Sequence, residues 1–149
     1  MDAQRVDAVR GWGLTVLRVV VGIVFLVHGL QKLLVVGFGG VAEFLGALGV
    51  PAPGLFAVIV TLVEALGGLA LIVGLLTRLA AILLAVDMLV AILAVHLPNG
   101  FFASDFGYEF PLVLLASSVA LAVAGAGEAG LDGVLARRTR NPTLARLTR

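Results

Sequence analysis

One apolar stretch near the N-terminus, residues 12–36, constrains the fold more than any other feature of the sequence. It is about 25 residues long, and a helix of about 20 apolar residues crosses the hydrocarbon core of a bilayer. Because ionisable side chains cost several kcal/mol when they face lipid, those inside the stretch are expected to face protein or water. At helical spacing they share one stripe with small and aromatic residues, namely Arg18, Gly22, Phe25, Gly29 and Lys32.

The composition of the whole chain is typical of an integral membrane protein. Of its 149 residues, 61% are hydrophobic and 13% are charged, whereas a soluble domain of this length needs more polar surface. The net charge of +1 gives no electrostatic signature of nucleic-acid binding. Cysteine is absent, which excludes disulfides, thiolate-bound metals, iron–sulfur clusters and a thiol redox step in this chain. We therefore expect one membrane domain over residues 1–149.

Three further apolar stretches follow the first. The predicted membrane spans are residues 12–36, 55–76, 79–97 and 110–126. The link at residues 77–78 is very short, so the second and third spans are expected to run antiparallel. Gly67 and Gly68, one turn after Glu64, predict close packing between helices. The fold class predicted from this pattern is an all-α integral membrane four-helix bundle with up-down-up-down topology.

The segments between the spans carry signals for turns and for short helices. Residues 41–48 place apolar side chains at helical spacing, which predicts a short interfacial helix between spans one and two. The glycines between residues 37 and 40 are expected to end the first span, and Pro98 is expected to end the third. Asp132 is expected to cap a short helix over residues 133–138.

Basic residues outside the spans are distributed unevenly. They fall in the N-terminal tail, in the link after the second span and in the C-terminal tail, and they are Arg5, Arg10, Arg78, Arg137, Arg138, Arg140, Arg146 and Arg149. The loops at residues 37–54 and 98–109 contain none. Because Lys and Arg concentrate on the cytoplasmic side of a membrane, both termini and the basic tail, residues 133–149, are predicted to be cytoplasmic.

A series of short motifs runs along the chain in a recognisable order. These motifs are HGLQKL at 28–33, the turn at 46–51, Glu64 followed by Gly67-Gly68, GLLTR at 74–78, HLPNGFF at 96–102, GYEF at 107–110, and GAG at 125–127 with Leu131-Asp132. In order and spacing they resemble the DoxX family of small four-helix membrane proteins of bacteria and archaea. The resemblance covers roughly residues 14–135.

The resemblance implies a multi-pass protein of the bacterial or archaeal plasma membrane that serves oxidoreductase systems. Relatives belong to a thiosulfate:quinone oxidoreductase and to a redox-stress complex associated with superoxide dismutase. A soluble redox partner protein is implied as well. The positions that match the family pattern are Arg18, His28, Lys32, Glu64, Arg78, His96 and Glu109. Asp87 lies outside that pattern, so the resemblance implies no role for it.

Several titratable residues are predicted to meet at the outer end of the bundle, and they are His28, Lys32, His96, Tyr108 and Glu109. Such a pocket could hold a quinone headgroup, because quinone carbonyls accept hydrogen bonds and quinone reduction takes up protons. The alternative is a polar network that closes the bundle at the interface. A haem between His28 and His96 is disfavoured because His28 lies several residues deeper, and the usual ligand set of a zinc site is missing.

Arg18, Glu64 and Asp87 are charged residues inside the predicted spans. Arg18 lies about 7–8 Å from the cytoplasmic end at 1.5 Å per residue, so its side chain can reach the interface or pair with Glu64 or Asp87. An unpaired charge in lipid is costly, so Glu64 is expected to be either paired with Arg18 or protonated. Such an ion pair could be structural or functional.

Three functions are compatible with these residues. The first is a redox-complex subunit that binds quinone, with a partner flavoprotein or a bound cofactor carrying the electrons. The second is a transporter of a small solute or ion that uses Arg18, Glu64 and Asp87. The third is a scaffold that anchors a soluble partner through the basic tail. Whether the chain is itself an enzyme stays open, and its glycine-lined faces permit a homo-oligomer.

Overall fold

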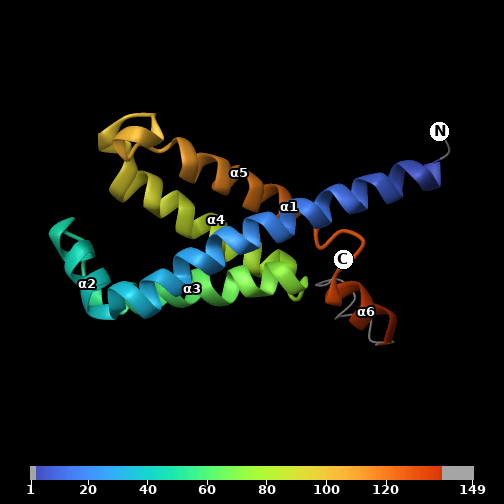
Figure 1. Cartoon of the computed structure of the whole chain (residues 1–149), viewed down its shortest axis with the longest axis horizontal. Helices are drawn as coiled ribbons and strands as arrows, with labels where there is room; N and C mark the ends of the chain where they lie inside the picture. The colour runs from blue at the N-terminus through green and yellow to red at the C-terminus, as the bar shows by residue number, and fades with distance from the viewer. Residues whose placement is uncertain (1–2, 139–149) are drawn as a thin grey trace.

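The protein is a bundle of helices, described by a computed structural model over residues 3–138 (Figure 1). All regular structure within this range is helical, which confirms the predicted all-α membrane fold. Among the described residues, three helical segments are long and apolar enough to cross a membrane, namely Arg5–Ala47, Pro53–Val73 and Thr77–Asn99. The predicted fourth span corresponds to a shorter apolar helix, Glu109–Ala124. Residues 139–149, which include most of the basic tail, lie outside the described range.

The first span continues without a break into the short helix that follows it. Helix α1 (Ala3–Gln31) passes through a π-helical turn, η1 (Lys32–Val36), into α2 (Gly37–Ala47). The first span was predicted to end at glycines 37–40, and η1 does end at Val36, but these glycines open α2. Gly37 has φ +71°, which allows the chain to bend there. Packing of α2 against the next helix outweighs the low helix propensity of its glycines.

Helices α3 (Pro53–Val73) and α4 (Thr77–Ala91) form a tight antiparallel hairpin. The carboxylate of Asp132 accepts hydrogen bonds from the backbone N–H groups of Leu76 at 2.7 Å and Thr77 at 2.9 Å. Asp132 was predicted to cap the helix at 133–138, but it lies within the first turn of α6 (Leu131–Arg138) and caps α4 instead. The reason is tertiary, because its own N–H donates to the Gly74 carbonyl at 2.9 Å and holds it against the hairpin turn.

Helix α4 changes its winding before it reaches the loop at residues 98–109, which is called the outer loop below. It passes into a second π-helical turn, η2 (Ile92–His96), and then into a 3₁₀ turn, η3 (Leu97–Asn99). Pro98, the predicted end of the third span, lies inside η3, where the helical path finishes. A further 3₁₀ turn, η4 (Ala103–Asp105), precedes α5 (Glu109–Ala124).

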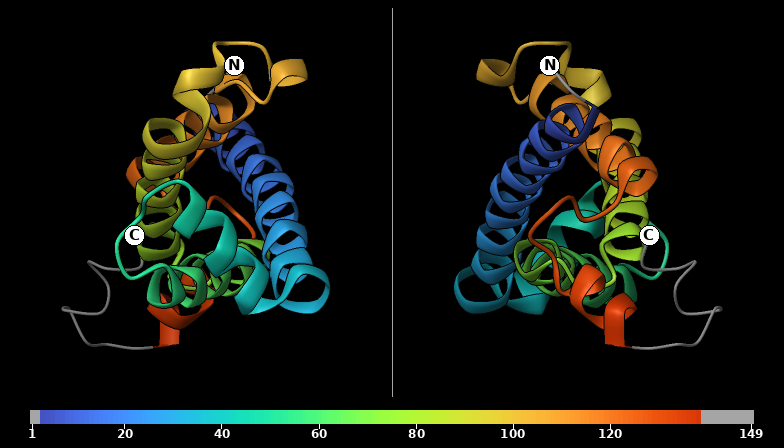
Figure 2. Two further views of the ribbon diagram at one scale, coloured as in Figure 1. Left: turned by 90° about the vertical axis from the view of Figure 1, so that its left-hand side faces the viewer. Right: turned by 90° about the vertical axis from the view of Figure 1, so that its right-hand side faces the viewer.

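The helices pack as two pairs that diverge toward one end. Helix α1 packs on α3 and α4 packs on α5. The glycines predicted to allow close packing do so, because a methyl group on Gly22 of α1 would lie 2.8 Å from the carbonyl oxygen of Gly68 on α3. In Figure 1 the pairs converge near α6 and spread apart toward α2 and the outer loop. The end views in Figure 2 show the separated pairs, with α2 lying alongside α3.

The hydrophobic core occupies the converging half of the bundle. Its most buried members come from all four long helices, and they are Phe25, Leu71, Ala81, Leu84 and Leu121. The start of α1, the α3–α4 turn and α6 lie toward this end of the molecule, whereas α2 and the loop before α5 lie toward the other (Figure 1). The diverging half is therefore the part of the bundle that the core leaves open.

Candidate functional site

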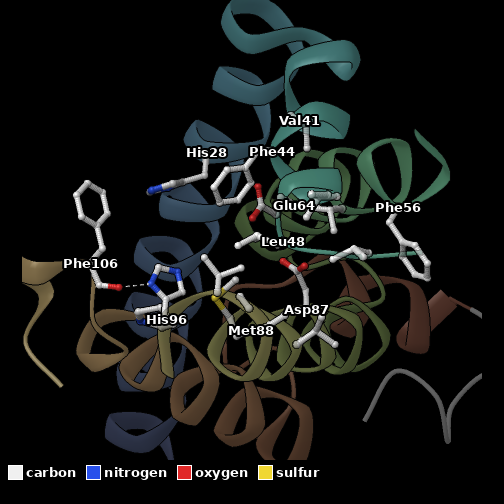
Figure 3. A pocket seen from close by; sticks show the side chains of 18 of the residues that line it. His28, Val41, Phe44, Leu48, Phe56, Glu64, Asp87, Met88, His96 and Phe106 are labelled. Carbon is white, nitrogen blue, oxygen red and sulfur yellow. Dashed lines mark hydrogen bonds between the residues drawn. The ribbon is translucent and has the colours of Figure 1, made fainter. Parts of the chain in front are cut away.

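A cavity of about 980 Å³ lies between the diverging helix pairs (Figure 3). Its wall is largely apolar and includes side chains from α1, α2, α3, α4, η2, α5 and the outer loop. Phe25, Met88 and Leu114, which belong to the core, form its inner end. The polar and charged residues in its wall are His28, Lys32, Glu64, Asp87, His96 and Asn99. The cavity thus combines an apolar volume with a small set of convergent polar groups, which is the usual character of a ligand site.

The deepest charged contact in the cavity is an ion pair between Lys32 and Glu64. Lys32 is the first residue of the π turn η1, and Glu64 lies in the middle of α3. The Glu64 side chain is 6% exposed and that of Lys32 is 26% exposed. The predicted partner of Glu64 was Arg18, and this was wrong. The α1–α3 packing places the outer end of α1, not its Arg18 end, beside the carboxylate.

Asp87 of α4 adds a second carboxylate to this ion pair. It interacts electrostatically with both Glu64 and Lys32, and Figure 3 shows Glu64 and Asp87 pointing into the same space from opposite walls. Its Oδ2 atom is buried and accepts no hydrogen bond from the described residues. Lys32, Glu64 and Asp87, called the charged triad below, therefore leave one carboxylate oxygen available to a ligand or to a proton.

The two histidines line the cavity nearer its outer end. Nδ1 of His28 lies 2.8 Å from the Val24 carbonyl, and Nδ1 of His96 lies 2.7 Å from the Phe106 carbonyl. A carbonyl oxygen can only accept, so Nδ1 carries the proton in each ring. In a neutral ring, Nε2 is then the free acceptor. Both histidines can therefore receive a hydrogen bond from a hydroxyl group without losing their backbone contacts.

Arg18 lies at the opposite end of the bundle from the cavity. It is 1% exposed, and its Nη2 donates to the Ala129 carbonyl at 2.5 Å. Its guanidinium lies against Gly74 and Gly130, where a methyl group on Gly74 would overlap it. The three predicted ion-pair residues therefore separate. Glu64 and Asp87 face the cavity, whereas Arg18 joins α1 to the segment after α5.

Tyr108 and Glu109 were predicted to line the pocket, but neither lies in the wall of the cavity. The Glu109 carboxylate accepts a hydrogen bond from the backbone N–H of Ala103 at 3.0 Å. The Tyr108 ring meets the Phe101 ring edge to face at 5.4 Å. The outer loop folds back on the start of α5, so both side chains are used to hold the loop in shape.

Comparison with known proteins identifies the family of the chain. The family model described as DoxX matches residues 13–97, which is more than half of the chain. The chain belongs to the DoxX family. A DoxX-type relative from Bacillus subtilis (strain 168), named "Putative oxidoreductase CatD", is 34% identical over 129 residues, covering 87% of this chain and 91% of CatD. No solved structure matches the chain.

In this DoxX protein the cavity gathers three of the five residues predicted for it, His28, Lys32 and His96. Sequence reasoning did not place Glu64 and Asp87 in the cavity, although a signal was present. The two carboxylates lie at nearly equal sequence distances before and after the tight α3–α4 turn, so an antiparallel hairpin brings them to a similar depth. Nothing in the sequence points to the π turns that carry Lys32 and His96.

Proposed function

We propose that this DoxX protein is the membrane subunit of a quinone-linked oxidoreductase or redox-stress complex, and that its cavity binds the quinone headgroup. The observation that carries the proposal is the position of the charged triad at the inner part of a largely apolar cavity. A quinone is itself an apolar molecule with two polar carbonyl groups. The name of CatD as an oxidoreductase supports the same class of function.

The cavity offers suitable partners to both redox states of a quinone. Lys32 has three N–H donors and uses one on Glu64, so it can donate another to a headgroup carbonyl. The free Oδ2 of Asp87 and Nε2 of His96 can accept hydrogen bonds from the hydroxyl groups of the reduced form. These same groups can hold or release the protons that accompany quinone reduction. We assign the electrons to a soluble partner protein, because the chain has no cysteine.

The paired carboxylates also suit a transporter that couples to a proton or cation. Transport requires a path across the whole bundle. Between the cavity and the α3–α4 turn, the core side chains of Phe25, Leu71 and Leu84 are almost fully buried and fill the space between the helices. This packing supports a closed binding site in preference to a transport path.

The location of the site in the cell forms part of the proposal. With both termini in the cytoplasm of a bacterium or archaeon, as the basic residues predict, the cavity lies in the outer half of the plasma membrane. A cytoplasmic partner protein would then approach the opposite end, where α6 and the basic tail begin. A scaffold that binds such a partner and no quinone is the remaining alternative.

The test is quinone binding to the purified chain. The double variant Lys32→Met/Glu64→Gln removes both members of the ion pair and leaves Asp87 as the one carboxylate of the triad. Glu109→Gln is the matched control outside the cavity. We expect about tenfold weaker binding of the double variant, since a hydrogen bond to a charged group contributes about 1.5 kcal/mol or more. The control should bind as wild type does. Failure of folded wild type to bind quinone, or equal affinity in all three proteins, would contradict the proposal.

A further inference from the structure

The cavity is lined on one side by α2 and on the other by the outer part of α4, and these two segments have few contacts with each other. Helix α2 packs on α3 and η1, and makes no extensive contact with α4 or η2. Apolar side chains from both segments line the cavity at this place. They are Phe44 of α2 and Leu48 at its C-terminal cap, together with Val90 of α4 and Ala94 of η2. All four are exposed, although α4 and η2 belong to a segment apolar enough to cross the membrane. These four residues are called the lateral slot below.

The size of the cavity exceeds what a headgroup needs. Its volume of about 980 Å³ lies near the upper end of the range of about 300–1,000 Å³ for ligand sites. A quinone ring with its carbonyls is much smaller. The polar groups are confined to the triad and to the outer histidines and Asn99, so the remaining volume is bounded by apolar side chains. An apolar extension of the ligand would fill this remaining apolar volume.

We propose that the lateral slot holds the isoprenoid chain of a membrane-resident quinone and that the headgroup reaches the charged triad sideways from the bilayer. This inference rests on the proposed quinone function and specifies its substrate as a long-chain quinone. Passage through the slot keeps the chain in apolar surroundings throughout, whereas passage through the outer loop would expose it to water.

The outer loop offers a poorer route. The Phe106 carbonyl is held by His96 at 2.7 Å and by the side-chain amide of Asn99 at 3.4 Å, both of which follow α4. The N–H of Gly107 donates to the Phe102 carbonyl at 2.9 Å, and that of Tyr108 to the Gly100 carbonyl at 3.0 Å. These hydrogen bonds tie the loop across the outer end of the cavity. No comparable set of hydrogen bonds joins α2 to η2 among the described residues.

Photolabelling of the full chain in lipid nanodiscs tests the route. The probe is a ubiquinone analogue with a photoreactive diazirine in its chain, and the competitor is the same benzoquinone head without a chain. We expect adducts on residues 41–50 and 90–97, and at least a tenfold reduction of these adducts by excess competitor. Adducts on residues 100–109 that the competitor removes would overturn the slot and leave quinone binding intact. Adducts that the competitor does not affect would overturn quinone binding itself.

Two variants narrow the slot from opposite sides, Ala94→Trp on η2 and Leu48→Trp at the C-terminal cap of α2. Val119→Trp on the exposed face of α5 is the control. We expect each slot variant to bind the long-chain analogue at least tenfold more weakly while it binds the chainless quinone as wild type does. The control should bind both normally. Equal binding of the long-chain analogue by both slot variants and the control would overturn the inference. So would labelling of the slot by a photoreactive phospholipid that excess long-chain quinone does not displace.

Discussion

The buried carboxylate of Glu64 depends on Lys32 for its opposite charge. Removal of one partner of a buried ion pair costs about 3–5 kcal/mol, because the remaining charge stays buried. We expect Lys32→Met to lower the free energy of unfolding by about 3 kcal/mol, since it strands Glu64 and Asp87 together. Glu64→Gln should cost less, because Lys32 is partly exposed and keeps Asp87 as a neighbour.

The measurement is a double-mutant cycle on thermal unfolding in detergent. The double variant Lys32→Met/Glu64→Gln should recover part of the stability that Lys32→Met loses, because it removes the Glu64 charge and leaves only Asp87 without its cation. Independent, additive losses in the two single variants would show that the side chains do not interact.

For single residues, the sequence predicted that the buried carboxylate needs a partner, but it did not predict which residue that partner is. An acid midway along a span predicts a partner, because an unpaired charge in lipid is costly. Which basic residue is that partner depends on the depth at which the two helices cross. Arg18 and Lys32 lie on the same stripe of α1, so the pattern alone could not distinguish them. The structure assigns Lys32 to Glu64, and Arg18 to the Ala129 carbonyl.

At the level of elements, the end of the α3–α4 hairpin is held by a residue from the far end of the chain. Asp132 is 2% exposed and its two oxygens accept the N–H groups of Leu76 and Thr77. We expect Asp132→Ala to lower stability by about 2 kcal/mol, because it removes a helix cap and leaves two N–H groups without acceptors. Asp132→Asn keeps one acceptor oxygen and should lose less.

Hydrogen exchange can locate this effect. Faster exchange should appear at the amides of Leu76 and Thr77 in Asp132→Ala, ahead of any change in the middle of α5. Uniform acceleration along the chain would indicate general destabilisation, and unchanged exchange at these two amides would contradict the cap.

The helices themselves were predictable because long apolar runs and turn residues mark them directly. The local changes of winding within the helices and the start of α2 were not predictable. The two π turns have no sequence signature, and they arise where helix packing forces a local change of winding. The start of α2 was missed because glycine is only a weak signal against a helix when tertiary contacts favour one.

For the molecule as a whole, the distribution of basic residues predicts its orientation in the membrane. We predict that four spans place the C-terminus in the cytoplasm and the loop at residues 98–109 on the opposite side of the membrane. Reporter fusions at Arg149 and within that loop should therefore report opposite compartments. A cytoplasmic signal from both fusions would contradict the orientation and would also move the cavity to the other leaflet.

The two-pair architecture could not be read from the sequence. Up-down connectivity follows from the short links, but the angle at which α1–α3 diverges from α4–α5 depends on the packing of individual side chains. Glycines at Gly22, Gly29 and Gly68 draw one pair together. The cavity is a consequence of this divergence, which is why its apolar volume was not foreseen although three of its polar residues were.

The most direct test of the central claim is the quinone content of the chain purified from quinone-containing bacterial membranes. Ala91→Trp places a large ring inside the cavity, and Val119→Trp places the same ring on an exposed face of α5 outside it. Extraction of each purified, folded protein and quantification of bound quinone should show near-stoichiometric quinone in wild type and Val119→Trp, and at least a tenfold loss in Ala91→Trp. Absence of quinone from wild type, or equal content in the two tryptophan variants, would contradict a quinone site in this cavity.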